Sequence, residues 1–285
     1  MQNLEKKDFI KKLWKSIEKN KKPKELRKIR IIASKTFFEL FSKPEKNKSK
    51  IMKLIKNLYS GDPYIIKGAI SKKYIEFLKS ELINVSKNDK PRFFKMNKKC
   101  PNFWRRIDEK IAKKYSVVAV RDSYYFFRWN KDKLKIWKNF DTIWSLIKKL
   151  GGLEKNSFLN NLPKDGVVDR VQIVRYPENS GFIEPHFHDP TNQRIIISIY
   201  MSKKGVDYSS GGTYFFKGRK KINIEDFIEK GDVGIFYASM KHAVNPVKSV
   251  KKSSNKNYSG RWWCGLYSPE SDLVKNRNTS SPLSK

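Results

Sequence analysis

The sequence predicts an α+β protein in which a helical, basic N-terminal region precedes a jelly-roll sheet in the C-terminal half. Two observations predict this class. Apolar side chains recur at helical spacing through the first sixty residues, whereas short apolar segments bounded by Gly, Pro, Asn or Asp follow one another from Gly166 onward. We therefore expect an N-terminal extension over residues 1–60 and a main domain over residues 61–285, with its jelly-roll core at about 166–270.

The N-terminal half is expected to contain several helices and one strand. Apolar residues at helical spacing predict basic helices over about residues 9–17 and 31–41. A strand is expected at Tyr64, and Ser71 is a candidate cap for the helix that follows it. Aromatic side chains are frequent in residues 90–150, where they could stack nucleobases, but core packing of a strand and a helix is the favoured interpretation.

The composition is that of a globular chain. Hydrophobic residues make up 38% of the 285, which is enough for a buried core. No apolar run approaches the ~20 residues that a membrane-spanning helix needs, and the N-terminus has no apolar block of signal-peptide length. Cys100 and Cys264 are far apart and form no CxxC pair. We expect a soluble, cytoplasmic protein with two reduced structural thiols.

The net charge of +35 has two interpretations. It indicates an anionic partner, such as a nucleic acid, a phosphate-bearing molecule or a lipid surface. It also fits the lysine- and asparagine-rich composition of an AT-rich genome, because many lysines alternate with asparagine and serine in no compact pattern. Helix-turn-helix and zinc-finger signatures are absent from the sequence, so the second interpretation is favoured.

The chain contains three histidines, and all of them lie in the β-rich half. His186 and His188 belong to G-F-I-E-P-H-F-H-D-P, and His242 belongs to M-K-H-A-V-N-P. Side chains two apart on a strand share a face, so this pair can bind one ion while a later strand supplies His242. Imidazole is a common ligand of transition metals, and three ligands on one face leave positions open for a co-substrate and dioxygen. The pattern predicts a metal enzyme.

Five segments stand in order between residues 167 and 267, namely Q-I-V-R-Y-P-E-N-S-G-F-I-E-P-H, R-I-I-I-S-I-Y-M-S, Y-S-S-G-G-T-Y-F, G-D-V-G-I-F-Y-A-S-M-K-H-A-V-N-P-V and G-R-W-W-C-G-L-Y. Together they resemble the iron(II)/2-oxoglutarate-dependent dioxygenases, particularly the prolyl-hydroxylase-like branch. The resemblance implies a double-stranded β-helix, Fe(II), 2-oxoglutarate as co-substrate and ascorbate as an optional reductant. The implied reaction is hydroxylation of a substrate with release of succinate and CO2.

The resemblance also implies roles for particular residues. Family members hold iron through a His-x-Asp/Glu pair and a distal histidine, and a basic residue beyond that histidine binds 2-oxoglutarate. These roles carry over to His186, His242 and Arg261. Arginine suits the last role because its planar fork binds a carboxylate through two parallel hydrogen bonds. The alternative for this arginine is an ion pair with a structural Asp.

The sequence departs from the family at the middle ligand. His188 stands where the family has a carboxylate, and Asp189 follows it directly. Side chains alternate between the two faces of a strand, and this strand parity favours His188 and an all-histidine face. A small bulge before Pro190 would turn Asp189 inward instead. Both assignments stay open.

Strand parity adds further candidates for the co-substrate site. Gln172, Tyr176, Ser198 and Tyr200 are expected to face the cavity and donate to the carboxylates of 2-oxoglutarate. The segment 90–150 is expected to supply the lid and the contacts to an unidentified substrate, a small molecule or a macromolecule, with an anion favoured. Its arginines are not ranked from the sequence; they are Arg105, Arg106, Arg121 and Arg128.

Two other functions compete with this one. A cupin-like metal oxygenase without 2-oxoglutarate would also use H-x-H and a distal histidine, but Gln193 stands where cupins usually have glutamate. The other alternative is a basic nucleic-acid-binding protein whose β-domain has no catalytic role.

Overall fold

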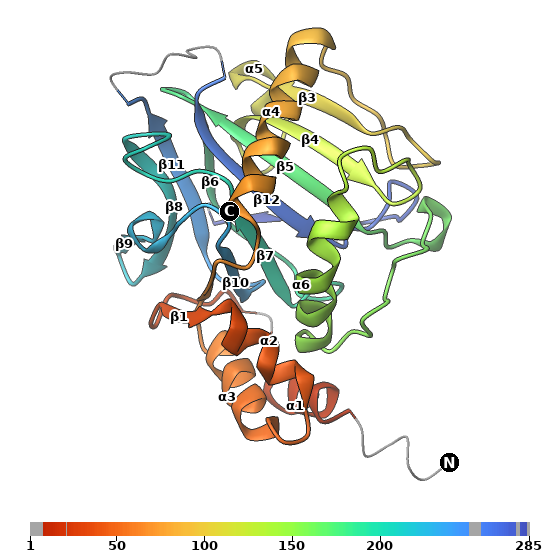
Figure 1. The fold of residues 1–285 in the computed structure, drawn as a ribbon, viewed down its shortest axis with the longest axis vertical. Coiled ribbons are helices and arrows are strands. Elements are labelled where there is room, and N and C mark those ends of the chain that lie inside the picture. The colour runs from red at the N-terminus through yellow and green to blue at the C-terminus, as the bar shows by residue number, and fades with distance from the viewer. Residues whose placement is uncertain (1–7, 21, 251–257, 278–279, 284–285) are drawn as a thin grey trace.

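A computed structural model describes residues 8–20, 22–250, 258–277 and 280–283. The described helices divide into an N-terminal group of three and a later group that covers the sheet (Figure 1). They are α1 (Phe9–Ile17), α2 (Ser34–Ser42), α3 (Lys48–Tyr59), α4 (Lys72–Asn88), α5 (Glu109–Ala112) and α6 (Ile136–Leu150), with short 3-10 helices η2 (Pro163–Asp165) and η3 (Glu225–Phe227).

Strands occupy most of the C-terminal half, as the change of apolar period at Gly166 predicts. They are β1 (Arg30–Ala33), β2 (Tyr64–Lys67), β3 (Phe103–Ile107), β4 (Ala119–Phe127), β5 (Arg170–Pro177), β6 (Phe182–Phe187), β7 (Ile195–Tyr200), β8 (Ser210–Lys217), β9 (Lys220–Asn223), β10 (Val233–Tyr237), β11 (His242–Lys248), β12 (Gly260–Tyr267) and β13 (Ser281–Pro282).

The strands are hydrogen-bonded in the order β1-β2-β10-β7-β12-β5-β4-β6-β11-β8-β9, with β3 beside β4 and β13 beside β6. This order of strands divides at β4 into a larger and a smaller sheet. The body of β4 pairs with β5 of the larger sheet, whereas Ala119 at its start pairs with Ile183 of β6 in the smaller one. This is the two-sheet arrangement of a jelly roll, so the predicted α+β class and jelly-roll core are confirmed.

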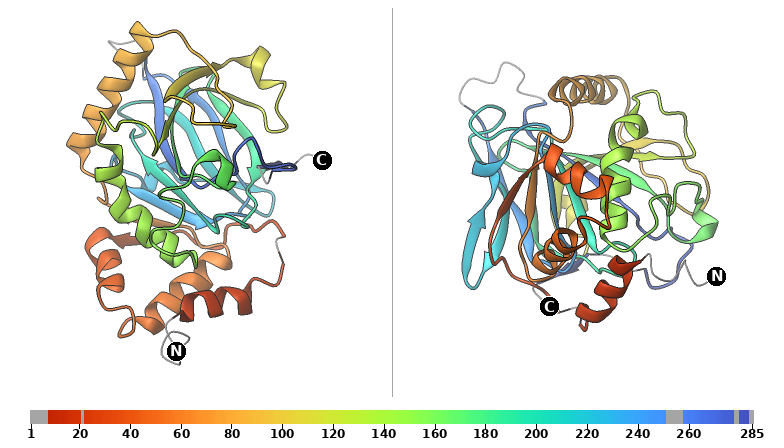
Figure 2. Two further views of the ribbon diagram at one scale, coloured as in Figure 1. Left: turned by 90° about the vertical axis from the view of Figure 1, so that its right-hand side faces the viewer. Right: turned by 60° about the horizontal axis from the view of Figure 1, so that its bottom comes forward.

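The helices α4 and α6 lie across one face of the larger sheet (Figures 1 and 2). The side chain of Ser71 caps α4 by accepting a hydrogen bond from the Tyr74 backbone N–H, and Gly151 is the C-cap of α6. The Lys148 ammonium of α6 is buried and pairs with Asp169 at 2.6 Å. The cap predicted at Ser71 is therefore confirmed, and Gly151 lies where the sequence K-K-L-G-G predicts the end of a helix.

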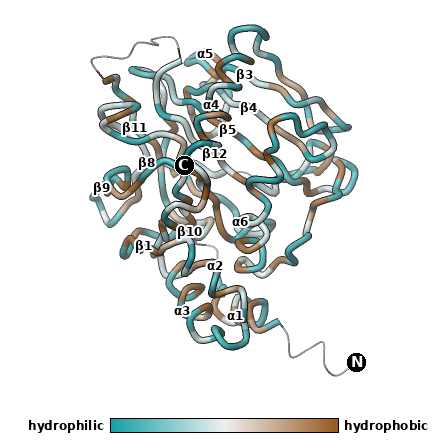
Figure 3. Tube along the Cα trace, viewed as in Figure 1, coloured by the Kyte–Doolittle hydropathy of each residue, from teal (hydrophilic) through white to brown (hydrophobic). Residues whose placement is uncertain are grey.

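The N-terminal helices pack against the same sheet, below it in Figure 1. Apolar and polar residues alternate along them in Figure 3, as expected of amphipathic helices. Trp14 of α1 is fully buried, stacks on Tyr237 of β10, and donates its indole hydrogen bond to the Leu150 carbonyl at 2.8 Å. The expected boundaries of a separate N-terminal extension stay a prediction.

Two local expectations were wrong. The helix expected over residues 31–41 begins only at Ser34, because Arg30–Ala33 instead pairs in parallel with β2 at the edge of the sheet. The Ser- and Asn-rich composition from Lys275 predicts a frayed end, but β13 pairs with β6. In both places, backbone pairing with a distant strand overrides the local pattern. The Ser-, Asn- and Lys-rich composition of residues 248–260 predicts a polar loop, which falls mainly on residues 251–257, outside the described ranges.

Two further expectations can be compared with the described residues. Cys100 and Cys264 are both buried and free of disulfides, in agreement with the prediction of structural thiols. Among the described helices, none is both long and apolar enough to cross a bilayer.

Candidate metal centre

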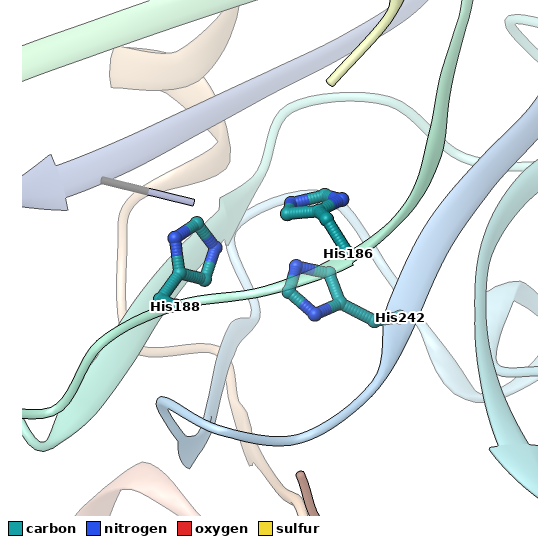
Figure 4. Close-up of side chains that lie close together, drawn as sticks. All are labelled: His186, His188 and His242. Carbon is teal, nitrogen blue, oxygen red and sulfur yellow. The ribbon is translucent and has the colours of Figure 1, made fainter. Parts of the chain in front are cut away.

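The three histidines converge at the place where β6 and β11 pair (Figure 4). His186 of β6 and His242 of β11 are direct register partners, and His188 lies two residues beyond His186 on the same side. One ligand nitrogen from each of the three rings lies within 4.8 Å of the others. The structure therefore brings together all three histidines that the sequence analysis selected.

Hydrogen bonds to the Nδ1 atoms fix the orientation of the rings. The Nδ1 atom of His186 lies 2.7 Å from the Glu184 carbonyl, and that of His242 lies 2.9 Å from the Met240 carbonyl. A carbonyl can only accept, so both rings donate from Nδ1 and keep the Nε2 lone pair for another partner. The Nδ1 atom of His188 lies 2.9 Å from the Ser280 hydroxyl. This outer ring of hydrogen bonds is the arrangement that orients metal-ligating histidines.

Burial keeps these imidazoles neutral. It lowers the pKa of His242 from its ordinary value of 6.5 to about 4. The pKa values of His186 and His188 lie well below the ordinary value, first because of burial and then because of repulsion from neighbouring histidines. A metal ion at neutral pH therefore competes with few protons for these nitrogen atoms.

Asp189 lies on the wall of the site but outside this cluster. Its carboxylate accepts a hydrogen bond from the Thr191 backbone N–H at 2.7 Å, which stabilises the turn after β6. The two alternatives for the middle ligand thus differ in position: His188 is part of the three-nitrogen cluster, whereas the Asp189 carboxylate stabilises the turn after β6.

A cavity of about 260 Å³ opens between the two sheets above the histidines. Its walls come from both sheets, so strand parity decides which side chains reach it. Of the four other candidates, Gln172, Tyr176 and Ser198 line the cavity. Tyr200 does not, although its ring centroid lies 5.9 Å from the Arg261 guanidinium.

Arg261 of β12 lies at one end of this cavity and is 1% exposed. Its Nε and Nη2 atoms pair with Glu225 at 3.0 and 2.8 Å, and Nη2 also donates to the Thr213 hydroxyl at 2.7 Å. The Nη1 atom is buried without a hydrogen-bond partner among the described residues. The expected alternative of a structural acid is thus present as Glu225 rather than Asp, while one guanidinium nitrogen, Nη1, has no partner among the described residues.

Glu225 is the functional residue that the sequence analysis missed most completely. It lies in η3, is 2% exposed, and accepts hydrogen bonds from Arg261, the Thr213 backbone N–H and the Tyr208 hydroxyl. These bonds hold the guanidinium in one orientation. No local pattern marks Glu225, because its partners come from other strands.

Two arginines on the cavity wall were also missed as site residues. Arg121 of β4 was named but not ranked, and Arg170 of β5 was not selected. Arg170 shares a strand face with Gln172 and Tyr176, so the parity argument that selected those two residues could have found it.

Comparisons with known proteins agree with this architecture. No family model and no curated protein matches the chain. Among solved structures, the chain is similar to the full-length Neurospora crassa thymine-7-hydroxylase in complex with alpha-KG, with a TM-score of 0.50 and 12% identity over 85% of each chain. The chain therefore has the double-stranded β-helix fold of that protein, and the resemblance predicted for residues 167–267 is confirmed for the fold.

Two further solved structures are similar at lower scores. One is a Pseudomonas putida prolyl-4-hydroxylase, with a TM-score of 0.46 and 11% identity over 76% of this chain and 98% of that chain. The other is JOX2 in complex with 2OG, Fe, and JA, with a TM-score of 0.48 and 12% identity over 94% of this chain and 88% of that chain.

The depressed pKa of His242 predicts a pH-dependent stability of the metal-free protein. Between pH 6.5 and about 4 the unfolded state binds the proton and the folded state does not, so stability falls as the pH falls. Lowering the pH from 6.5 to 5 should cost about 1.5 kcal/mol through this group. Urea unfolding at several pH values measures the slope, which should be smaller in His242→Gln. Equal slopes in both proteins would contradict the assignment.

The buried ion pair predicts a large effect of Glu225→Gln. This change leaves the Arg261 charge buried without its counter-ion, so the free energy of unfolding should fall by about 3 kcal/mol. Asp226→Asn is a matched control on the same 3-10 helix, where the carboxylate is 65% exposed and its loss should cost under about 0.5 kcal/mol. Similar decreases in the free energy of unfolding in the two variants would show that the Glu225–Arg261 ion pair does not contribute the predicted stability.

Proposed function

We propose that this protein is an Fe(II)/2-oxoglutarate-dependent oxygenase, an oxidoreductase that acts on an anionic substrate. The observation that carries the proposal is the pairing of two features in one cavity. Three neutral histidines present ligand nitrogens within 4.8 Å of one another, and Arg261 offers an unpartnered buried nitrogen at the end of the same cavity. A metal and a carboxylate-bearing co-substrate match these two features.

In this proposal His186, His188 and His242 hold the metal through Nε2. Their neutral state suits a divalent cation, and the hydrogen bonds at Nδ1 keep the rings in place without a metal. When bound, Fe(II) and 2-oxoglutarate supply the activation of dioxygen, with release of succinate and CO2. Three ligands from one side leave coordination positions open toward the cavity.

Arg261 binds the carboxylate of 2-oxoglutarate that lies away from the metal. Glu225 and Thr213 occupy its other nitrogen atoms, and the unpartnered Nη1 is the atom that would donate to this carboxylate. The cavity position of Tyr176, Gln172 and Ser198 supports a role for these three side chains as further donors. The similar thymine-7-hydroxylase structure contains alpha-KG, which favours the same co-substrate here.

The cupin-like alternative has weaker support. Gln193 lies on the cavity wall, but its amide donates to the carbonyls of Ile195 and Leu266 and its oxygen accepts from the Ser268 backbone N–H. These bonds give Gln193 a structural role rather than that of a fourth metal ligand. The cupin-like alternative also provides no ligand for the unpartnered Nη1 atom of Arg261.

The co-substrate claim is tested by adding Fe(II) and 2-oxoglutarate to the metal-free protein under anaerobic conditions. We expect a visible metal-to-ligand charge-transfer band. Arg261→Lys keeps a charge beside Glu225 but loses the planar fork, so the 2-oxoglutarate concentration at half-saturation should rise about tenfold. Arg219→Gln removes an exposed arginine outside the cavity and should change nothing. A folded wild type without the band would refute the proposal.

The identity of the third ligand is tested by two separate alanine variants. Iron content after reconstitution should fall strongly in His188→Ala and stay near the wild-type value in Asp189→Ala, because only His188 belongs to the nitrogen cluster. Circular dichroism verifies that both variants are folded. Loss of iron in Asp189→Ala alone would replace the all-histidine site by a site with two histidines and one carboxylate.

A further inference from the structure

Two exposed aromatic rings and an arginine lie together on β3 and the segments beside it. The other aromatic residues of the segment 90–150 are buried or half-buried, whereas Phe93 and Tyr115 are 57% and 45% exposed. The guanidinium carbon of Arg105 contacts both rings, at 4.5 Å from the Phe93 centroid and 5.4 Å from the Tyr115 centroid. We call these three side chains the β3 surface.

Hydrogen bonds hold the parts of this surface together. The backbone N–H of Arg92 donates to the Trp104 carbonyl of β3 at 2.8 Å, which places the next residue, Phe93, beside the strand. Tyr115 follows α5, and its hydroxyl accepts a hydrogen bond from Nη2 of Arg105 at 2.5 Å. The two rings are therefore exposed but positioned before any ligand binds, which reduces the entropy cost of binding.

The β3 surface lies in a strongly basic part of the chain. Residues 90–115 contain ten lysines and arginines but only two acidic residues. Arg105 forms no ion pair with a described carboxylate, whereas the next residue, Arg106, pairs with Asp122 at 3.0 Å. Exposed basic residues without such an ion pair also stand next to the rings in the sequence, namely Arg92, Lys95, Lys113 and Lys114. The described part of the chain thus supplies no counter-ion for this surface, which would attract an external anion.

The β3 surface adjoins the cavity wall, because β3 lies beside β4 (Figure 1). In this pairing Ile107 is opposite Arg121 and Arg105 is opposite Ser123. Arg121 lines the cavity, and the Ser123 hydroxyl lies 3.5 Å from the amide nitrogen of Gln172, another residue of the cavity wall. Side chains of paired residues share a face of the sheet, so Arg105 lies on the cavity side.

Exposed rings among unpaired cations match the chemistry of a single-stranded nucleic acid. Every base has a flat face that can stack on an aromatic ring, and its phosphates are attracted to neighbouring lysines and arginines. A lipid surface would require a continuous apolar face, which two rings that both contact a guanidinium do not provide. An acidic peptide would pair with the charges but would give the rings no flat partner.

We propose that the β3 surface binds a single-stranded nucleic acid, with bases stacked on Phe93 and Tyr115 and a phosphate on Arg105. This binding site goes beyond the proposed function and needs neither metal nor 2-oxoglutarate. A bound strand would lie beside the cavity wall, because Arg105 shares its face of the sheet.

The test measures the fluorescence anisotropy of a labelled oligothymidylate of about twelve nucleotides with the metal-free protein. Heparin, a polyanion without bases, is the second probe and is titrated as a competitor. Phe93→Ala and Tyr115→Ala keep the net charge, so each should weaken oligothymidylate binding about tenfold and leave heparin binding unchanged. Arg105→Gln should weaken the binding of both probes.

Phe77→Ala is the matched control, because it removes a ring of α4 that is 45% exposed. It should change the binding of neither probe, and circular dichroism verifies that all variants are folded. Three results would overturn the proposal: a wild type that does not bind oligothymidylate, ring variants that bind it as tightly as the wild type, or equal weakening in Phe77→Ala. Absence of the charge-transfer band would refute the proposed function alone, since this test uses the metal-free protein.

Discussion

The pairing of β6 with β11 is the constraint on which the site depends. It makes His186 and His242 register partners, so backbone pairing brings together two histidines from distant parts of the sequence. A slip of one residue would turn both side chains of the H-x-H pair to the opposite face. β8 pairs with β11 and β13 pairs with β6, so the β6–β11 pair has a neighbouring strand on each side. Ser280, which directly precedes β13, lies against His188.

A second constraint is the distribution of charge inside the cavity. Arginines and the three histidines line the described cavity wall, and burial lowers the pKa of each of the three imidazoles. Glu225 neutralises and orients Arg261, whereas the Nε atoms of Arg121 and Arg170 are buried without a hydrogen-bond partner among the described residues.

Much of the fold and the centre of the site could be predicted from the sequence, because local patterns encode them. Short apolar segments bounded by turn residues indicated the strands, Ser71 begins α4 and Gly151 ends α6, and the alternation of side chains along a strand put His186 and His188 on one face. Long-range pairing was not predictable. Residues 30–33 and 281–282 join the sheets through distant strands, and Glu225 meets Arg261 only after the chain has folded.

In the proposed function, the three histidines and Arg261 together hold one metal and one co-substrate. Diffraction from crystals grown anaerobically with Fe(II) and 2-oxoglutarate, recorded at the iron absorption edge, tests it most directly. We expect an anomalous peak bounded by the Nε2 atoms of His186, His188 and His242, with a 2-oxoglutarate carboxylate on Nη1 of Arg261. Iron bound away from these nitrogens, or a co-substrate that does not reach Arg261, would contradict the account.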